Sequence, residues 1–217
     1  MNKPTVPVLY LFDNVFYPET IIPLVLSDEP SKNLIRQAFS DENSVALLSN
    51  HPKSKGIATL GKIVMLDEKR IDGKVTAIIV GTERVMLTKL VQHLPYPVFE
   101  HMPYQDQRET HVLVPGALER LHHTFENWVN KHVHSMEDRE VFLKDINSPR
   151  KLLFNISLFM VKDIELKILF LESTSIVDRL NLLNALFPNE NLESEDESIA
   201  EAIKNFDRLE PNYDIAN

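Results

Sequence analysis

The sequence predicts an α+β fold, in which β-strands occupy the first part of the chain and α-helices the second. Short apolar runs separated by turn residues, typical of strands, extend to about Tyr104. After Pro115-Gly116 the apolar residues instead recur about every 3.6 positions, as on one face of a helix. Strands that precede helices, instead of alternating with them, indicate an α+β fold and not a doubly wound α/β sheet.

The amino-terminal part is expected to form a closed or nearly closed antiparallel sheet. Asp72-Gly73 marks a hairpin between two of its strands, because both turn positions need residues that tolerate positive φ. One helix, Lys32–Phe39 with Ser31 as its N-cap, interrupts the strands. The runs predicted as strands are Val6–Phe12, Thr20–Leu26, Ser44–Leu48, Thr59–Leu66, Val75–Val80, Arg84–Val91 and Val98–Met102.

The carboxyl-terminal part is expected to form a helical bundle. Ser135 and Ser175 each stand three residues before an aspartate, which is the spacing of a capping box. Ser148-Pro149 combines an N-cap with a first-turn proline. The apolar faces of the three predicted helices are Leu118, Leu121, Phe125, Trp128 and His132; Leu152, Leu153, Ile156, Phe159 and Met160; and Ile176, Leu180, Leu183 and Phe187.

Acidic residues concentrate at the carboxyl-terminal end of the chain. Between Glu190 and Asn217, nine Asp or Glu and two Lys or Arg give −7 of the whole chain's net charge of −9. This composition predicts a flexible tail, in which only Ile199–Phe206 shows weak helical spacing. We therefore expect a β-domain over residues 1–108, a helical bundle over 109–188 and the acidic tail over 189–217.

The composition of the 217 residues excludes several classes of protein. The chain has no cysteine, so disulfides, thiolate zinc sites and cysteine nucleophiles are absent. It contains no apolar run of about 18 residues and no signal-peptide core, which predicts a soluble cytoplasmic protein without membrane contact. The net charge of −9 disfavours nucleic acid as a partner, because phosphate binding relies on Lys and Arg.

Three residue patterns could suggest chemistry, and each fits a structural role better. The stretch Gly56–Ile63 resembles part of a phosphate-binding loop, but Ile63 stands where a magnesium-binding hydroxyl is needed. Ser148 and Lys151 have the spacing of a Ser-Lys dyad, which the N-cap role of Ser148 explains more simply. The histidines near Glu119 and Glu126 do not converge on one point of a helix: His122, His123, His132 and His134. We therefore expect no catalytic residue, no cofactor and no metal.

Several blocks of the sequence resemble the amino-terminal, substrate-binding domain of Lon proteases. Leu9–Pro18 and Ile21–Leu24 are similar to that family's opening strand, aromatic-proline turn and second strand. Ile57–Ile63 and Ile79–Val85 resemble its Thr-x-Gly and Gly-x-x-Arg strands, with Asp-Gly between them. Thr174–Leu180 looks like the start of its late helix. The likeness runs in order from about residue 6 to 187.

The resemblance implies a PUA-like β-barrel joined to a helical bundle, and a role in recognising polypeptides. It also implies that the Lon ATPase and Ser-Lys protease domains are missing from this chain, so that it is not itself an enzyme. Three positions depart from the family pattern: Tyr10 replaces a common Pro, and Glu19 and Ala58 replace common glycines. If the family turn needs positive φ at position 19, Glu19 should force a different turn.

The function expected from these observations is that of a stand-alone recognition or adaptor protein. It would bind unfolded or degron-bearing polypeptides and could act with a protease or chaperone partner. Tyr17 and Tyr96, flanked by prolines, are expected to be the more exposed of the candidate binding residues. Those candidates are Tyr10, Phe12, Phe16, Tyr17, Tyr96, Phe99 and Tyr104. A free sheet edge could also bind an extended segment. The alternatives are an RNA- or small-ligand-binding PUA-like protein and a structural subunit of a larger complex.

Overall fold

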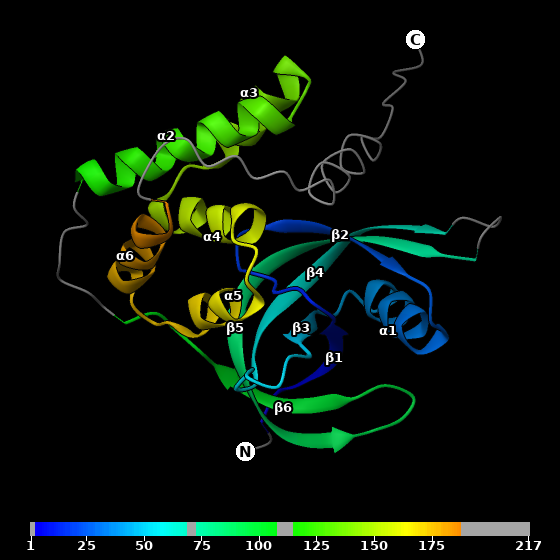
Figure 1. Cartoon of the computed structure of the whole chain (residues 1–217). Coiled ribbons are helices and arrows are strands. Elements are labelled where there is room, and N and C mark those ends of the chain that lie inside the picture. Colours follow the sequence, from blue (N-terminus) through cyan, green and yellow to red (C-terminus); the bar gives the residue numbers. More distant parts are fainter. Residues whose placement is uncertain (1–2, 69–72, 108–114, 188–217) are drawn as a thin grey trace, which may run out of the picture.

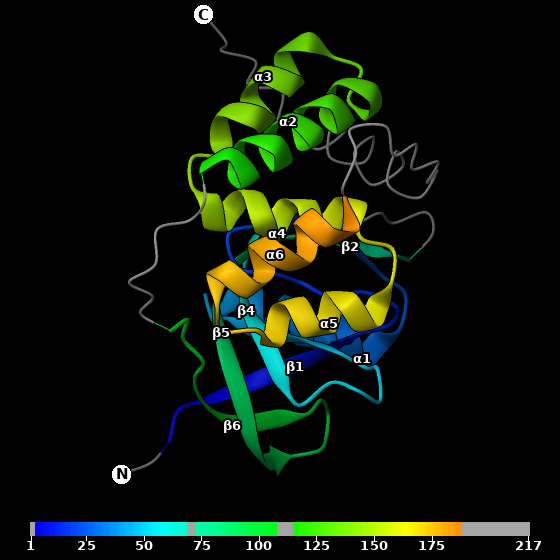
Figure 2. The same ribbon diagram turned by 60° about the vertical axis from the view of Figure 1, so that its left-hand side comes forward.

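The computed structural model describes residues 3–68, 73–107 and 115–187 of the chain. A six-stranded sheet comes first and five helices follow it, with one further helix between the second and third strands. Figures 1 and 2 show α4, α5 and α6 in a layer against the sheet, α2 and α3 beyond α4, and α1 on another side of the sheet. Within the described ranges no helix has both the length and the apolar character needed to cross a bilayer.

Five of the six strands close into a barrel. The strands are β1 (Thr5–Leu11), β2 (Ile21–Leu26), β3 (Val45–Ser49), β4 (Ile57–Glu68), β5 (Val75–Gln92) and β6 (Val98–Pro103). They are hydrogen-bonded in the order β2-β5-β4-β3-β1-β6, and β6 also pairs with β5. The cycle β5-β4-β3-β1-β6 is therefore closed, as predicted, and β2 lies outside it.

The expectation that all strands run antiparallel is wrong for one pair. β1 and β3 are parallel, with Val8 opposite Ala46 and Leu11 opposite Ser49. Parallel neighbours need a long crossover connection, and here the chain between them contains β2 and α1. The sheet is thus mixed, and the α+β class holds.

The two strands predicted at Val75–Val80 and Arg84–Val91 are one strand, β5, which is 18 residues long. Its amino-terminal half pairs with β2 and β4 outside the barrel, and its carboxyl-terminal half pairs with β4 and β6 within it. We call the three-stranded part outside the barrel, formed by β2 with residues 62–68 of β4 and 75–80 of β5, the arm. The arm projects from the barrel in Figure 1.

The helix boundaries follow local capping signals, with one correction and one omission. The helices are α1 (Glu29–Ser40), α2 (Pro115–His132), α3 (Met136–Asp145), α4 (Pro149–Met160), α5 (Ile164–Glu172) and α6 (Ile176–Leu186). Ser135, Ser148 and Ser175 cap α3, α4 and α6, as predicted. The Ser31 cap is wrong, because Asp28 accepts a hydrogen bond from the Ser31 N–H and Pro30 lies in the first turn.

Helix α5 was not expected, because its sequence lacks the 3.6-residue period. Six of its nine residues, IELKILFLE, are apolar and lie on every side of the helix. Asp163 caps it by accepting hydrogen bonds from the backbone N–H groups of Glu165 and Leu166. The helix is nearly apolar all round because it lies in the layer between barrel and bundle.

One apolar core joins the barrel side to the helices. It includes Phe16 and Ile35 from the first part of the chain and Phe125, Phe154 and Leu183 from the helices. A second, smaller cluster consists of Val6, Val8, Ala46, Ala58, Leu60 and Val85, all from barrel strands. The division at residue 108 stays a prediction, as do the flexible tail and its helix at 199–206, which lie outside the described residues.

Candidate functional site

Tyr17 connects the barrel side to two helices of the bundle. Its side chain is fully buried, so the expectation of an exposed Tyr17 is wrong. The ring stacks on Phe154 of α4 and meets Phe170 of α5 edge-on. The hydroxyl lies 2.7 Å from the Ser157 hydroxyl and donates to the Lys167 carbonyl at 2.9 Å. Burial raises the pKa of Tyr17 above its ordinary value, so the hydroxyl stays protonated at neutral pH.

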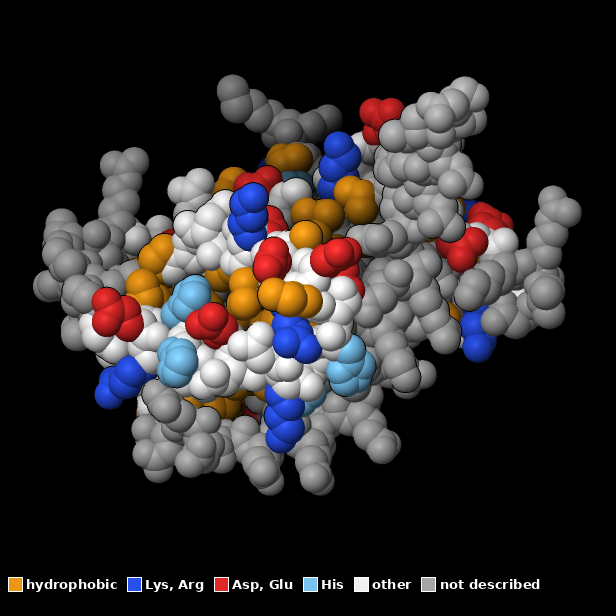
Figure 3. Space-filling model, turned by 90° about the horizontal axis from the view of Figure 1, so that it is seen from above, with side chains coloured by type: hydrophobic (Ala, Val, Ile, Leu, Met, Phe, Trp, Pro, Cys, Tyr) orange, Lys and Arg blue, Asp and Glu red, His pale blue; other side chains and the backbone are white. Residues whose placement is uncertain are grey.

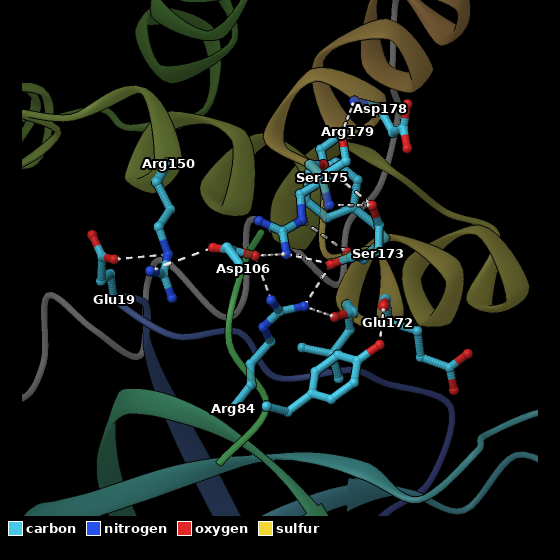
Figure 4. Close-up of polar contacts among 12 residues, drawn as sticks. Glu19, Arg84, Asp106, Arg150, Glu172, Ser173, Ser175, Asp178 and Arg179 are labelled. Carbon is cyan, nitrogen blue, oxygen red and sulfur yellow. Dashed lines mark hydrogen bonds and ion pairs between the residues drawn. The ribbon is translucent and has the colours of Figure 1, made fainter. Parts of the chain in front are cut away.

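Beside Tyr17, three arginines surround one carboxylate (Figure 4). Asp106, which follows β6, pairs with Arg84 of β5 and, at 2.6 Å, with Arg179 of α6. The second oxygen of Asp106 lies 3.4 Å from Arg150 of α4. Arg84 and Arg179 also donate to the backbone carbonyl of Ser173, between α5 and α6. We call Tyr17 and these four charged residues the junction.

Burial disfavours the charged form of the arginines in the junction, whereas their pairing with Asp106 favours it. Desolvation, and then the neighbouring Arg179, lower the pKa of Arg84 to about 10, which still leaves it charged at pH 7. The Arg84 guanidinium lies 5.0 Å from the centre of the Tyr104 ring, and that of Arg179 lies 4.9 Å from the Phe154 ring. Arg84 and Arg179 are nearly inaccessible to solvent. The junction therefore holds elements together around two buried guanidinium groups.

The motifs behind the family resemblance build this junction. Thr59 donates its hydroxyl proton to the Phe16 carbonyl at 2.6 Å, which fixes the chain before Tyr17. A Cβ at Gly81 would lie 2.2 Å from the Tyr17 carbonyl oxygen, so only glycine allows the Tyr17 backbone to approach β5. A Cβ at Gly61 would lie 2.4 Å from Ile79. These residues position elements and do not form a binding site.

Glu19 occupies the turn after Tyr17-Pro18 in a left-handed conformation. It takes a φ of 60° itself, and its backbone N–H donates to the Gly81 carbonyl at 2.9 Å. Its carboxylate lies 3.1 Å from the Arg150 guanidinium, which brings α4 to the same turn. The left-handed conformation of this non-glycine residue costs about 1 kcal/mol.

The predicted binding residues do not form one surface. Phe16 is in the core, like Tyr17. Phe99 packs against the small cluster of barrel residues, and Tyr96 donates to Gln37 of α1 at 2.7 Å. Tyr104 lies under Arg84 and donates to the Glu172 carbonyl. The exposed members of the set are Tyr10 and Phe12, at 37% and 75%.

The other patterns considered in the sequence have structural roles here. Residues 57–63 of the loop-like stretch lie in strand β4. The Ser148 hydroxyl accepts from the Lys151 backbone N–H, while the Lys151 amine pairs with Asp145 at 2.5 Å. His132 stacks on Trp128. In the ranges that the structure describes, no three His, Cys, Asp or Glu side chains are placed to hold a metal ion.

The outer face of the arm is a continuous apolar surface that sequence reasoning missed. Strand register places Ile21 opposite Val80, Pro23 opposite Ile78 and Val25 opposite Thr76, so these side chains share one face. Met65 of β4 lies opposite Ile78 and extends the row. Val64, at the β-bulge, is 51% exposed, and Val25 is 56% exposed. None of the apolar residues of this face belongs to either core cluster.

The opposite face of the arm is packed against the rest of the protein. Ile22, Ile63, Val75, Ala77 and Ile79 alternate with the outer residues and belong to the main core. The arm is thus apolar on both faces but covered on only one by the core. Its outer residues define the candidate site, which we call the outer face: Ile21, Pro23, Val25, Val64, Met65, Ile78 and Val80.

A signal for the outer face is present in the sequence. All six residues of β2, IIPLVL, are apolar, and the run AIIV in β5 shows no alternation. A strand with one solvated face should alternate between apolar and polar residues, whereas a continuous apolar run is typical of strands covered on both faces. Pro23 fits a strand that pairs on one side only, and it removes one donor from the free edge.

A rival apolar surface lies on helix α3, and it is less continuous. Met136 and Val141 are 72% and 69% exposed. Seen from the side of α2 and α3, apolar side chains of this face are interspersed with histidine and charged side chains (Figure 3). An uninterrupted row of large apolar groups, as on the arm, excludes water more effectively than single ones. The outer face is therefore the stronger candidate.

Comparisons with known proteins place the chain in a family. The family described as "ATP-dependent protease La (LON) substrate-binding domain" matches residues 5–187. Lon protease of Escherichia coli (strain K12) is 25% identical over 197 residues, which cover 85% of this chain and 25% of that protein. Lon protease of Geobacter metallireducens is 29% identical over 129 residues, covering 53% of this chain and 16% of that protein. The chain thus spans about a quarter or less of these relatives.

Solved structures share the fold. The amino-terminal domain of Lon protease from the Mycobacterium avium complex superposes with a TM-score of 0.64 at 15% identity, over 84% of this chain and 97% of that one. A Lon amino-terminal domain protein from Xanthomonas campestris superposes with a TM-score of 0.61 at 17% identity, over 84% of this chain and 98% of that one. With the family match over most of the chain, these similarities show that the protein belongs to the Lon substrate-binding domain family.

Proposed function

We propose that the protein is a recognition module that binds apolar segments of unfolded polypeptide on the outer face of the arm. The observation that carries this proposal is a row of apolar side chains that lie outside the core clusters of the described residues, on strands whose other face is core. Membership in a substrate-binding family supports polypeptide as the ligand class. The binding itself needs no catalytic group and no nucleotide. We further propose a cytoplasmic adaptor role, in which bound clients pass to a separate protease or chaperone.

The chemistry of the outer face favours an apolar polypeptide over RNA. The seven side chains of the face are apolar, and the basic residues that the structure describes beside it are Lys62 at its barrel end and Lys74 at its far end. Nucleic-acid binding would instead require several Lys or Arg side chains that displace counterions from phosphates. Valine and isoleucine side chains on a pleated surface fit an extended segment with alternate apolar residues.

The test is binding of a permanently unfolded protein, reduced and carboxymethylated α-lactalbumin, to variants of the full chain. Val25→Asp places a charge toward the far end of the outer face, opposite Thr76, at an exposed position, so folding should be retained. We expect it to weaken binding at least tenfold, because a carboxylate would be desolvated under an apolar segment. Fluorescence anisotropy of the labelled probe, with and without ATP, measures the effect.

The matched control is Val141→Asp, which makes the same substitution at the exposed position on α3. It should leave the dissociation constant of the probe within about twofold of the wild type. Equal binding by wild type and Val25→Asp would refute the outer face as the site. Loss with Val141→Asp alone would move the site to α3.

A further inference from the structure

The outer face has a potential occupant in the chain itself. Ile199, Ile203 and Phe206 follow one another at spacings of four and three, which would place them on one side of a helix. They lie in the carboxyl-terminal segment, outside the described residues. We propose that residues 199–206 bind the outer face and compete there with client polypeptide. This inference rests on the proposed function of that face and concerns its regulation.

The segment is long enough to reach the arm. Eleven residues, 188–198, separate the last described residue from Ile199. Fully extended, such a connection spans about 40 Å. A folded body of this size has a radius of gyration of about 16 Å, so the arm is within range of the end of α6. Tethering of this kind gives an effective concentration on the order of millimolar, so even weak apolar contacts occupy the face much of the time.

Charge should determine which end of the outer face the acidic part of the bound segment lies at. Five residues before the apolar stretch, Glu193–Glu197, contain four carboxylates. The outer face has exposed Lys62 opposite Val80 at its barrel end and Asp67 opposite Thr76 at its far end. Asp67, Glu68 and Lys74 at the far end sum to −1, whereas Lys62 contributes +1 at the barrel end, so the acidic run should lie toward the barrel. Salt should weaken this contribution and leave the apolar contact in place.

Disulfide crosslinking tests the contact directly, because the chain has no cysteine of its own. Val25→Cys combined with Ile203→Cys should crosslink under mild oxidation at least about tenfold faster than a control pair, as expected from the difference in local concentration. The control combines Ile203→Cys with Leu94→Cys, which is 81% exposed between β5 and β6. Equal rates for the two pairs, or a product of dimer mass, would overturn the proposal.

Client binding tests the consequence. If the segment occupies the face about nine-tenths of the time, Ile203→Asp with Phe206→Asp should tighten binding of unfolded α-lactalbumin about tenfold. Tyr213→Asp with Ile215→Asp adds the same charge elsewhere in the tail and should change nothing. An unchanged affinity in the first variant, in a chain whose binding Val25→Asp abolishes, would overturn the inference and leave the proposed function intact. Fast specific crosslinking without any client binding would support the internal contact and refute the proposed function.

Discussion

The junction and the outer face of the arm differ in nearly every physical respect. The junction is polar and centres on the buried side chains of Tyr17, Arg84 and Arg179, whereas the outer face is apolar, lies outside the core clusters and has Val25 and Val64 more than half exposed. Two of the residues that make the sequence recognisable, Tyr17 and Arg84, belong to the junction, and a third, Gly81, packs against the Tyr17 backbone. These residues of the family pattern therefore attach the barrel to the helices. The surface proposed for binding is formed by apolar residues that lie outside both core clusters.

This contrast predicts the largest loss of stability at the charged centre of the junction. Arg84→Ala should lower the free energy of unfolding by about 3–5 kcal/mol, because it removes a buried guanidinium together with its ion pair and hydrogen bonds. The Leu171 carbonyl loses its side-chain donor, while Asp106 and the Ser173 carbonyl keep Arg179 as a partner. Urea unfolding followed by circular dichroism measures the change. A loss below 1 kcal/mol would mean that the junction does not hold the two parts together.

The close approach at Gly81 predicts the next largest effect. Gly81→Ala should destabilise by about 1–3 kcal/mol, because its Cβ would clash with the rigid Tyr17 backbone. Gly116→Ala is the matched control, since nothing lies within 4 Å of a Cβ there and helix α2 favours alanine over glycine. The midpoints of urea unfolding should move in opposite directions for the two variants.

Because the Tyr17 hydroxyl is buried, the free energy of unfolding should depend on pH in the alkaline range. Tyr17→Phe should lower the free energy of unfolding by about 1–3 kcal/mol at pH 7, because the hydroxyl's partners on α4 and α5 lose a buried hydrogen bond. Burial raises the folded-state pKa of Tyr17, so in the wild type only the unfolded chain releases this proton above pH 10.0. Wild-type stability should thus fall above that pH more steeply than that of Tyr17→Phe. Parallel pH profiles of the two proteins would contradict this assignment.

Replacing Glu19 should change stability by a smaller amount and in the opposite direction. Glu19→Gly should stabilise the protein by up to about 1 kcal/mol, because glycine adopts positive φ without strain. Loss of the half-exposed pair with Arg150 offsets part of this gain. Thermal unfolding compared with Glu42→Gly, a second residue at positive φ outside the junction, separates the two contributions.

The outer face should be the least sensitive region in stability and the most sensitive in binding. Val25→Ser should change the free energy of unfolding by less than about 0.5 kcal/mol, since the side chain is more than half exposed. The same variant should weaken binding of the unfolded probe. A substantial loss of stability would show that the face is already covered in the folded chain.

Local signals in the sequence predicted the fold well. The serine caps of α3, α4 and α6 were identifiable because a cap involves only neighbouring residues. A closed or nearly closed sheet was expected from the succession of strand-like runs, and the barrel from the family resemblance. The continuity of β5 was missed because Gly81 reads as a strand break, and only the approach of Tyr17 explains it. Helix α5 was missed because apolar residues all round a helix give no period.

The candidate site was much less predictable. Pro18 suggested an exposed loop around Tyr17, but residues about 140 and 150 positions later in the chain enclose its hydroxyl. No local pattern encodes that enclosure. The outer face, in contrast, had a local signal in the unbroken apolar runs of β2 and β5, which were interpreted only as strands. An unbroken apolar strand needs a layer on each face, and no second layer was predicted over β2 and β5, which indicates an apolar surface there.

The length of β5 has a mechanical consequence. One strand begins in the arm, where a client would bind, and continues into the barrel wall to Arg84 and beyond. Tension on a bound polypeptide would therefore travel along a single backbone to the residue that anchors α5 and α6. In single-molecule pulling, the arm should not yield as a separate unit. The barrel and helices should resist and rupture together with it.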